Sequence, residues 1–305
     1  MTENEIVLHF HRRPNALTSI ALALCGISTH FKMGDRVPKI KAVWEDVKID
    51  AGHLKDFGEV CGLPPHGEFL YPLYPLTFIY PLILRILGHR KAPLSVFRML
   101  NTKLHVTSHR RIGIHEPLRI ICETGPLRIV PKGLELDLAS SVQTHDETVW
   151  ESLHTFYYRG KFGEGNSSHL DQPELPLISE PKTVASWHLP DGVGFRFSRI
   201  SGDANGIHYS SLYARLHGFK RDFAQPILIL SKSLSRFSDF EASRFRLLAL
   251  FKGPVYYKGN VSIKGILSEE GIRFDIYCED NPRPSLSCQL GWEISSRLSP
   301  SIPGP

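Results

Sequence analysis

The chain has 305 residues, of which 42% are hydrophobic, a length and composition typical of a globular protein with two domains. Its 36 Lys and Arg against 31 Asp and Glu give a formal net charge of +5, which is too small by itself to indicate nucleic-acid binding. The five cysteines form no C-x-x-C pair, so they indicate neither a disulfide framework nor a zinc site, and they favour a reducing, cytoplasmic location.

The first apolar stretch, "NALTSIALALCGI" (15–27), follows Arg12 and Arg13 in the manner of a signal peptide. It is too short to cross a bilayer, and Leu24 before Cys25 is not the small residue that cleavage needs. We therefore expect a buried helix or an amphipathic arm here. A second apolar stretch (71–88) contains prolines and Arg85, so the sequence predicts no membrane-spanning helix.

The first half of the chain is predicted to contain a helix followed by strands. The segment "LTFIYPLILRILG" (76–88) is an apolar helix candidate. Further along, Leu134, Leu136 and Leu138 alternate with other residues, "THDET" (144–148) forms a turn, and "VWESLHTFYYRG" (149–160) is rich in β-formers. This pattern is typical of a long β-hairpin.

The second half repeats this organisation after a segment rich in Gly, Ser, Pro and acids. Residues 211–219 are the helix candidate, with Gly218 as the C-cap, and the strands that follow include 271–280, where Gly271 occupies a turn. We expect a duplicated α+β unit whose sheet wraps a central helix: a first domain at 1–160, a linker at 161–186, a second domain at 187–297 and a disordered tail at 298–305. The common nucleotide-binding motifs GxGxxG after a strand and GxxxxGK[ST] are absent from the sequence.

The stretch "SGDANGIH" (201–208) gathers more polar chemistry than any other part of the chain. Asp203 and His208 lie in a predicted tight loop before a helix, so both side chains can point to one spot. A carboxylate and an imidazole can hold one water between them and exchange its protons near neutral pH. The structural alternative is that Asp203 or Asn205 only caps the helix that follows.

This stretch is part of a longer segment, 197–226, that resembles the hydratase signature of the MaoC-like acyl dehydratases, the (R)-specific enoyl-thioester hydratases. The signature reads S-G-D-x-N-P-[LIV]-H and then A-R-x-x-G-F, and the matching residues are Ser201, Gly202, Asp203, Asn205, Ile207, His208, Ala214, Arg215, Gly218 and Phe219. The resemblance implies a double hot-dog fold of the α+β class, in which each half is a helix wrapped by an antiparallel sheet.

The resemblance also implies an activity, the reversible hydration of 2-enoyl thioesters to 3-hydroxyacyl thioesters carried on coenzyme A or an acyl carrier protein. Asp203 and His208 would be the catalytic pair, and Asn205 would brace the loop and help to place the water. No metal and no redox cofactor would be needed.

Two positions depart from the family pattern. Gly206 replaces the family proline, which removes no functional group. Where the family reads A-H-G-M, this chain has "AQPI", so Pro226 removes a backbone N–H that would face the thioester oxygen. We expect either the side chain of Gln225 or the N-terminus of a helix beginning at Pro226 to replace that donor. The alternative is a catalytically impaired protein or subunit that only binds acyl thioesters.

The first half offers no second site, because "VCGLPPHGEF" (60–69) has Leu63 in place of the carboxylate and retains His66 alone. His66 is therefore expected to be structural, and the apolar helix at 76–88 is either a plain core helix or part of an acyl tunnel. Lys220 and Arg221 in "GFKRDF" are expected to contact the carrier, with a solvated face as the alternative. No nucleic acid is expected as a partner, and the sequence leaves open whether the chain forms a homodimer.

Overall fold

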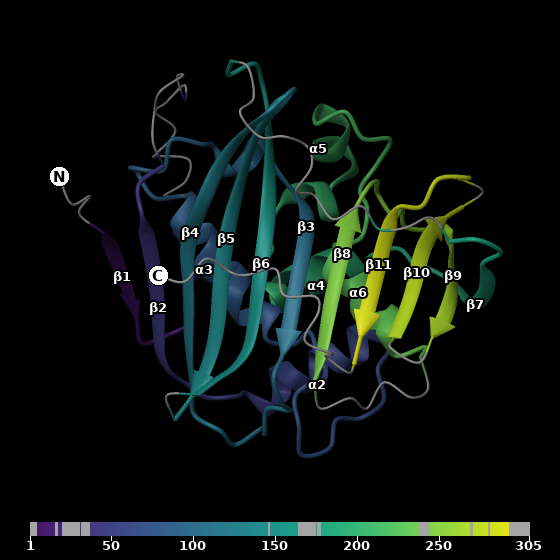
Figure 1. The fold of residues 1–305 in the computed structure, drawn as a ribbon, viewed down its shortest axis with the longest axis horizontal. Coiled ribbons are helices and arrows are strands. Elements are labelled where there is room, and N and C mark those ends of the chain that lie inside the picture. The colour runs from purple at the N-terminus through teal and green to yellow at the C-terminus, as the bar shows by residue number, and fades with distance from the viewer. Residues whose placement is uncertain are drawn as a thin grey trace.

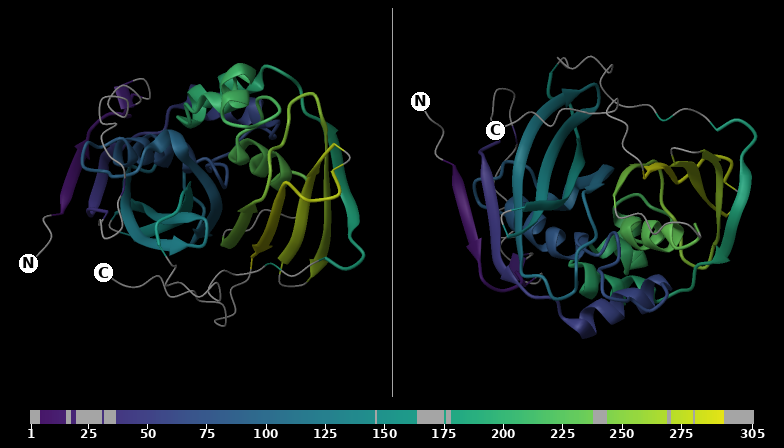
Figure 2. Two further views of the ribbon diagram at one scale, coloured as in Figure 1. Left: turned by 90° about the horizontal axis from the view of Figure 1, so that it is seen from above. Right: turned by 60° about the horizontal axis from the view of Figure 1, so that its bottom comes forward.

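The strands of the protein form one curved sheet, with the main helices on one side of it (Figure 1, Figure 2). The computed structural model describes residues 5–15, 18, 19, 31, 37–145, 147–163, 175, 178–237, 244–268, 271–279 and 281–292. The sheet has 11 strands in the order β1-β2-β4-β5-β6-β3-β8-β11-β10-β9-β7. Only the pair β1 and β2 is parallel among the pairings of these described strands.

The elements of the first half are β1 (Ile6–Phe10), β2 (Ile40–Val47), α2 (Ala51–Cys61), α3 (Leu76–Leu87), η1 (Val96–Arg98), β3 (Met99–Ser108), β4 (Leu118–Val130), β5 (Gly133–Thr144) and β6 (Glu147–Arg159). Those of the second half are β7 (Lys182–His188), α4 (Val193–Ser201), η3 (Gly206–His208), α5 (Ser211–Leu216), α6 (Pro226–Leu234), β8 (Phe245–Phe251), β9 (Asn260–Ser268), β10 (Gly271–Cys278) and β11 (Leu286–Gly291).

The two halves repeat one topology. In the first half the strands lie in the order β2, β4, β5, β6, β3 toward the junction, and in the second half they lie in the order β7, β9, β10, β11, β8. Counted along the chain from β2 and from β7, both orders are first, third, fourth, fifth, second. The two second strands, β3 and β8, then pair antiparallel from Lys103 opposite Leu250 to Ser108 opposite Phe245. The duplication expected from the sequence is therefore present, and the junction converts two sheets into one.

Several predicted elements are confirmed. The hairpin consists of β5 and β6, whose pairing continues to Thr144 opposite Glu147. The strand expected within 271–280 is β10, in which the alternate residues Ile272, Phe274 and Ile276 are buried. The apolar helix candidate is α3, and nearly all of its residues are buried.

The predicted central helix of the second half is wrong. Residues 211–219 form only the short α5, which exposes 71% of Leu212 and 76% of Leu216. The helix inside the second half is α6, whose apolar residues are buried. The apolar residues of 211–219 are misleading because the leucines of α5 face outward, and α6 occupies the interior in its place.

The expected linker at 161–186 overlaps the first strand of the second half. Residues 182–186 of the expected linker already belong to β7, which pairs with β9. Residues 20–27 of the first apolar stretch and the expected tail lie outside the described residues. None of the helices within the described ranges is long and apolar enough to cross a membrane.

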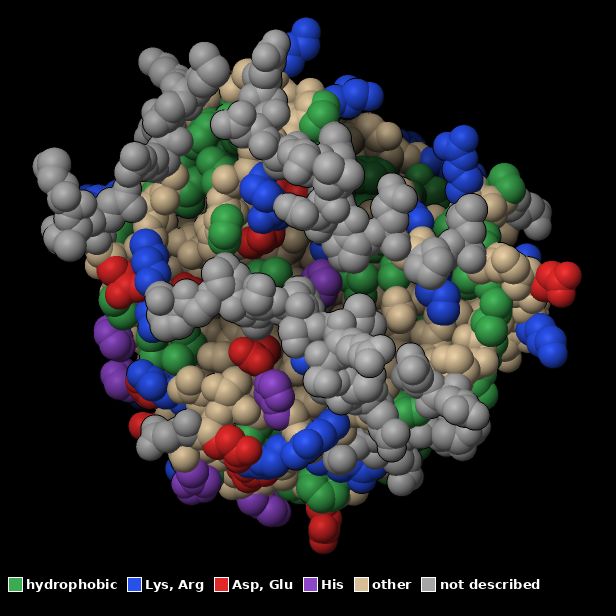
Figure 3. Space-filling view, viewed as in Figure 1, with side chains coloured by type: hydrophobic (Ala, Val, Ile, Leu, Met, Phe, Trp, Pro, Cys, Tyr) green, Lys and Arg blue, Asp and Glu red, His purple; other side chains and the backbone are tan. Residues whose placement is uncertain are grey.

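Figure 3 shows basic and acidic side chains interspersed on the visible part of one face. The four described cysteines are buried free thiols.

Helix α3 contains an internal proline, and Arg13 compensates for it. Pro81 has no N–H, so it cannot donate to the carbonyl of Thr77 four residues earlier. The guanidinium of Arg13 donates to Thr77 O at 3.2 Å instead. The same Nη2 donates to Ile200 O at 2.5 Å, close to the end of α4. One arginine therefore joins the interrupted helix of the first half to a helix of the second.

A histidine holds this guanidinium in place. Nε2 of His53 lies 2.8 Å from Arg13 Nη1 and 2.9 Å from Ile200 O, and Nδ1 lies 2.7 Å from the hydroxyl of Tyr74. Burial and then the charge of Arg13 lower the pKa of His53, so the imidazole stays neutral near pH 7 and can accept from the arginine.

We expect Arg13→Met to lower the free energy of unfolding by about 2–4 kcal/mol, because it leaves two partly buried carbonyls without their charged donor. The matched control is Arg12→Met, since Arg12 is exposed and its neighbour in sequence. Denaturant unfolding of both variants measures the difference. Equal stabilities for the two variants would show that the Arg13 bridge contributes nothing.

Candidate active site

The loop that carries Asp203 begins at a close contact between the two halves. Gly202 ends α4 in the left-handed region with φ of 78°, and its N–H donates to Ser198 O at 2.9 Å. A Cβ at this glycine would lie 2.6 Å from Cγ of Pro81. Glycine is therefore required here both for its conformation and for its contact with α3.

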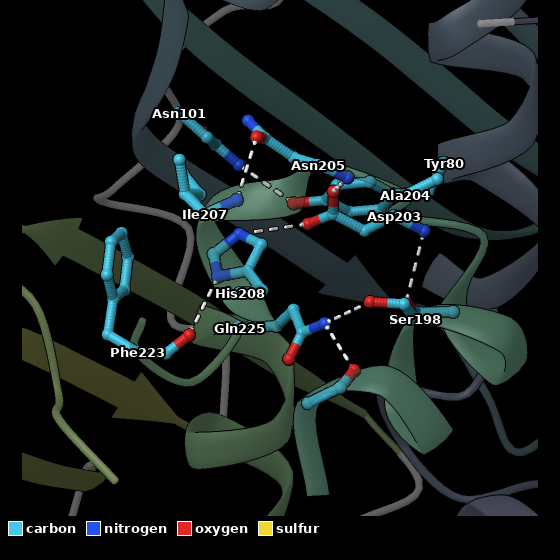
Figure 4. A network of polar contacts seen from close by, with 12 residues as sticks. Tyr80, Asn101, Ser198, Asp203, Ala204, Asn205, Ile207, His208, Phe223 and Gln225 are labelled. Atoms are coloured by element: carbon cyan, nitrogen blue, oxygen red, sulfur yellow. Dashed lines mark hydrogen bonds and ion pairs between the residues drawn. The ribbon is translucent and has the colours of Figure 1, made fainter. Parts of the chain in front are cut away.

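The loop is then shaped by its own side chains. Asp203 Oδ1 accepts from the backbone N of Asn205 at 3.2 Å, and Asn205 Oδ1 accepts from the N of Ile207 at 3.3 Å as the cap of η3. Asn205 thus braces the loop as expected, while its part in placing a water stays a prediction. The short helix η3 ends at His208 and turns its imidazole back toward Asp203 (Figure 4).

The carboxylate and the imidazole meet in a nearly buried position. Asp203 Oδ2 lies 3.4 Å from His208 Nε2, and the two side chains are 14% and 7% exposed. The capping alternative holds for Asn205, which caps η3, whereas Asp203 uses one oxygen within the loop and turns the other toward the imidazole.

The second nitrogen of His208 fixes its role. Nδ1 lies 2.9 Å from the carbonyl oxygen of Phe223, so Nδ1 carries a hydrogen and donates it. In the neutral imidazole, Nε2 is then a bare lone pair that faces a carboxylate. Two acceptors at this distance suit an arrangement in which a proton, or the hydroxyl of a bound molecule, is shared between them.

Gln225 does not have the role that the sequence suggested. Its Nε2 donates to Gly194 O at 3.1 Å and to Ser198 Oγ at 2.8 Å, so both amide hydrogens are used within the protein. Its Oε1 lies 3.4 Å from the hydroxyl of Tyr257. The expectation that this amide points into the site as a free donor is wrong, because α4 lies close enough to take both hydrogens.

The expected basic contacts differ from each other. Lys220 is 72% exposed in its side chain, with Nζ 4.0 Å from Glu279, so it remains accessible. Arg221 is only 25% exposed and lies 3.6 Å from Asp191 and 3.5 Å from Asp222. Its charge is therefore largely engaged within the protein, and contact of either residue with a carrier stays a prediction.

The first half has a counterpart of this loop without its chemistry. Helix α2 ends at Gly62 in the left-handed region, as α4 does at Gly202. The following loop contains Leu63 and His66, and Nδ1 of His66 contacts the carbonyl of its own neighbour Gly67 at 3.0 Å. This arrangement fits the structural role expected for His66.

Several residues around the pair were not found from the sequence. Gly194 on α4 lies so close that a Cβ would come within 2.0 Å of His208 O. Tyr80 of α3 accepts a hydrogen bond from Asn101 of β3 (Figure 4), and burial followed by the charge of Asp203 raises its pKa. No local signal in the sequence marked these residues, because they reach the site only through tertiary packing. Within the described ranges, no three His, Cys, Asp or Glu side chains are gathered as a metal site would require.

Comparison with known proteins is consistent with this geometry. No protein-family model matches the chain. It is 23% identical over 234 residues to 3-hydroxyacyl-thioester dehydratase X of Mycobacterium tuberculosis, an alignment that covers 74% of this chain and 81% of that protein.

Solved structures show the same fold. The crystal structure of HtdX of Mycobacterium tuberculosis matches with a TM-score of 0.71 and 19% identity over 82% of this chain and 98% of that one. A MaoC-like dehydratase from Phytophthora capsici gives a TM-score of 0.66 at 13% identity over 87% of this chain and 98% of its own. A further mycobacterial protein, described as having a double hotdog fold, gives 0.52 at 11% identity over 94% of this chain and 93% of its own. The resemblance seen in the sequence is thus confirmed: the chain is a homologue of 3-hydroxyacyl-thioester dehydratase X and has the double hot-dog fold of the MaoC-like dehydratases.

Proposed function

We propose that this protein is a hydro-lyase that interconverts 2-enoyl and 3-hydroxyacyl thioesters, with Asp203 and His208 as its catalytic pair. The observation that carries the proposal is the approach of Asp203 Oδ2 to His208 Nε2 at 3.4 Å, in a loop with the family motif. Homology to an acyl-thioester dehydratase supports the substrate class.

In the hydration direction the pair binds a water between its two side chains. One partner accepts a proton from the water as the oxygen adds to the β-carbon, and this proton is then delivered to the α-carbon. The pair therefore ends the cycle with the protons that it had at the start, and both parts of the water molecule are in the product. Dehydration follows the same path in reverse: the β-carbon–oxygen bond breaks and water leaves.

Negative charge develops on the thioester oxygen during the reaction and needs a donor. Since both hydrogens of Gln225 are used, the N-terminus of α6 is the remaining alternative. Pro226 occupies the first turn of this helix, where its missing N–H matters least. The N–H groups of Ile227 and Leu228, together with the helix dipole, stabilise the negative charge on the thioester oxygen in place of the backbone N–H of the family glycine.

The carrier is coenzyme A or an acyl carrier protein. Lys220 supports this assignment because its exposed ammonium lies on the segment between η3 and α6, near the site. A phosphate or an acidic protein surface is the chemistry that it would attract.

A second candidate is a non-catalytic protein that binds acyl thioesters. It is favoured by one observation, the proline at the position of the family's backbone donor. The two candidates differ in one measurement, because only the enzyme converts a trans-2-enoyl thioester that it binds.

We expect Asp203→Asn and His208→Gln each to lower the turnover of trans-2-enoyl-CoA by a factor of about 10² to 10⁴, since each removes one of the two proton-transfer groups. His66→Ala should keep most of the activity. The measurement is the hydration rate with short, medium and long enoyl chains.

An active Asp203→Asn protein, or a His66→Ala protein that folds but has lost activity, would contradict the assignment of the pair. Wild-type protein that binds these thioesters without converting them would favour the second candidate.

We expect Gln225→Met to lower the free energy of unfolding by about 1–3 kcal/mol while turnover by the folded protein changes less than about threefold. The reason is that its amide connects α6 to α4 and does not face the substrate. Denaturant unfolding and steady-state rates on the same preparation test this. A tenfold loss of turnover at unchanged stability would instead make Gln225 the oxyanion donor.

A further inference from the structure

Three polar side chains of the first half, two of them buried, form a cluster that is joined by hydrogen bonds. They are Tyr80 on α3, Asn101 on β3 and His154 on β6. The register of β3 against β6 shifts between Asn101 and Lys103, and such a bulge turns a side chain that would otherwise face the other side of the sheet. The side chain of Asn101 is thereby directed inward, toward Tyr80.

The hydrogen bonds of this cluster have a defined direction. Asn101 Nδ2 lies 3.2 Å from the hydroxyl oxygen of Tyr80 and 3.0 Å from Nδ1 of His154. Its two amide hydrogens supply one donor to each. Burial lowers the pKa of His154 to about 3, so its imidazole stays neutral and Nδ1 can accept.

Because Asn101 donates to the oxygen of Tyr80, the hydroxyl hydrogen of Tyr80 can be donated to another group. Burial, followed by the charge of Asp203, raises the pKa of Tyr80, so the phenol stays protonated at all ordinary pH values. Its oxygen already accepts from Asn101. Among the described residues, no acceptor for its own hydrogen is recorded.

Tyr80 is held close to the catalytic loop. Its neighbour Pro81 is the residue against which Gly202 packs, with 2.6 Å between Cγ of Pro81 and a Cβ built on the glycine. Asp203, the next residue, acts on Tyr80 through its charge. Figure 4 draws the hydrogen bond from Asn101 to Tyr80 and the contact between Asp203 and His208 in one view.

We propose that Tyr80 is a third catalytic residue, whose hydroxyl donates a hydrogen bond to the oxygen held by Asp203 and His208, and that Asn101 and His154 position it. The proposal rests on the proposed function, because that oxygen is the incoming water in hydration and the β-hydroxyl in dehydration. Tyr80 transfers no proton. Its hydrogen bond orients the oxygen while Asp203 and His208 exchange protons with it, so the first half contributes directly to the site.

The test is Tyr80→Phe, which keeps the ring and removes only the hydroxyl. Tyr158→Phe is the matched control, because Tyr158 is another buried tyrosine of the first half whose ring contacts Arg98. We expect kcat for hydration of a short trans-2-enoyl-CoA to fall about tenfold or more in Tyr80→Phe, with KM nearly unchanged. Asn101→Leu should show a loss in the same direction, and Tyr158→Phe should behave as wild type.

A binding measurement makes the test independent of turnover. In an Asp203→Asn background, the affinity for (R)-3-hydroxybutyryl-CoA is compared with that for butyryl-CoA, which lacks the β-oxygen. Adding Tyr80→Phe should reduce the preference for the hydroxylated ligand about tenfold.

The outcomes separate the two proposals. If wild type converts the substrate and Tyr80→Phe matches it in both rate and ligand preference, the Tyr80 assignment is overturned and the hydro-lyase stands. If wild type binds without turnover and the preference still depends on Tyr80, the hydroxyl contact stands and the enzyme does not. If wild type neither binds nor converts acyl thioesters, both proposals fail.

Discussion

The carbonyl group of Thr77 that Pro81 leaves without a helical donor is the constraint around which the two halves meet. Arg13 supplies the missing donor and, with the same nitrogen, donates to the carbonyl of Ile200 near the end of α4. Because Gly202 also packs against Pro81, the end of α4 is fixed to the irregular point of α3 both by a charged hydrogen bond and by contact. The loop with Asp203 starts from this fixed point.

The duplicated fold gives each half a loop at the same position, and only one of the two loops carries the candidate pair. Both α2 and α4 end on a left-handed glycine and lead into a loop at the same place in their half. Only the second loop contains a carboxylate opposite an imidazole, whereas the first has Leu63. The first half instead places Tyr80, which accepts a hydrogen bond from Asn101, where the charge of Asp203 raises its pKa after burial.

The start of α6 accommodates Pro226, a residue that departs from the family pattern. Proline at this position removes a backbone donor but is well suited to the first turn of a helix. Gln225 just before it connects α6 to α4 through Ser198 and Gly194. The carbonyl of Phe223, two residues earlier, accepts from Nδ1 of His208 at 2.9 Å. The departure therefore leaves the orientation of the imidazole intact.

Local patterns in the sequence determined the duplication, the hairpin, the buried α3 and the pair Asp203 and His208, because alternation, turn residues and a short motif are properties of neighbouring positions. The same reasoning failed for residues 211–219, since a local apolar pattern does not say which face another element will cover, and α6 occupies the interior instead. Tertiary structure alone decided the partners of Gln225, the bridge made by Arg13 and the hydrogen bond from Asn101 to Tyr80. Each of these depends on groups far apart in the chain, whose distances are set by packing.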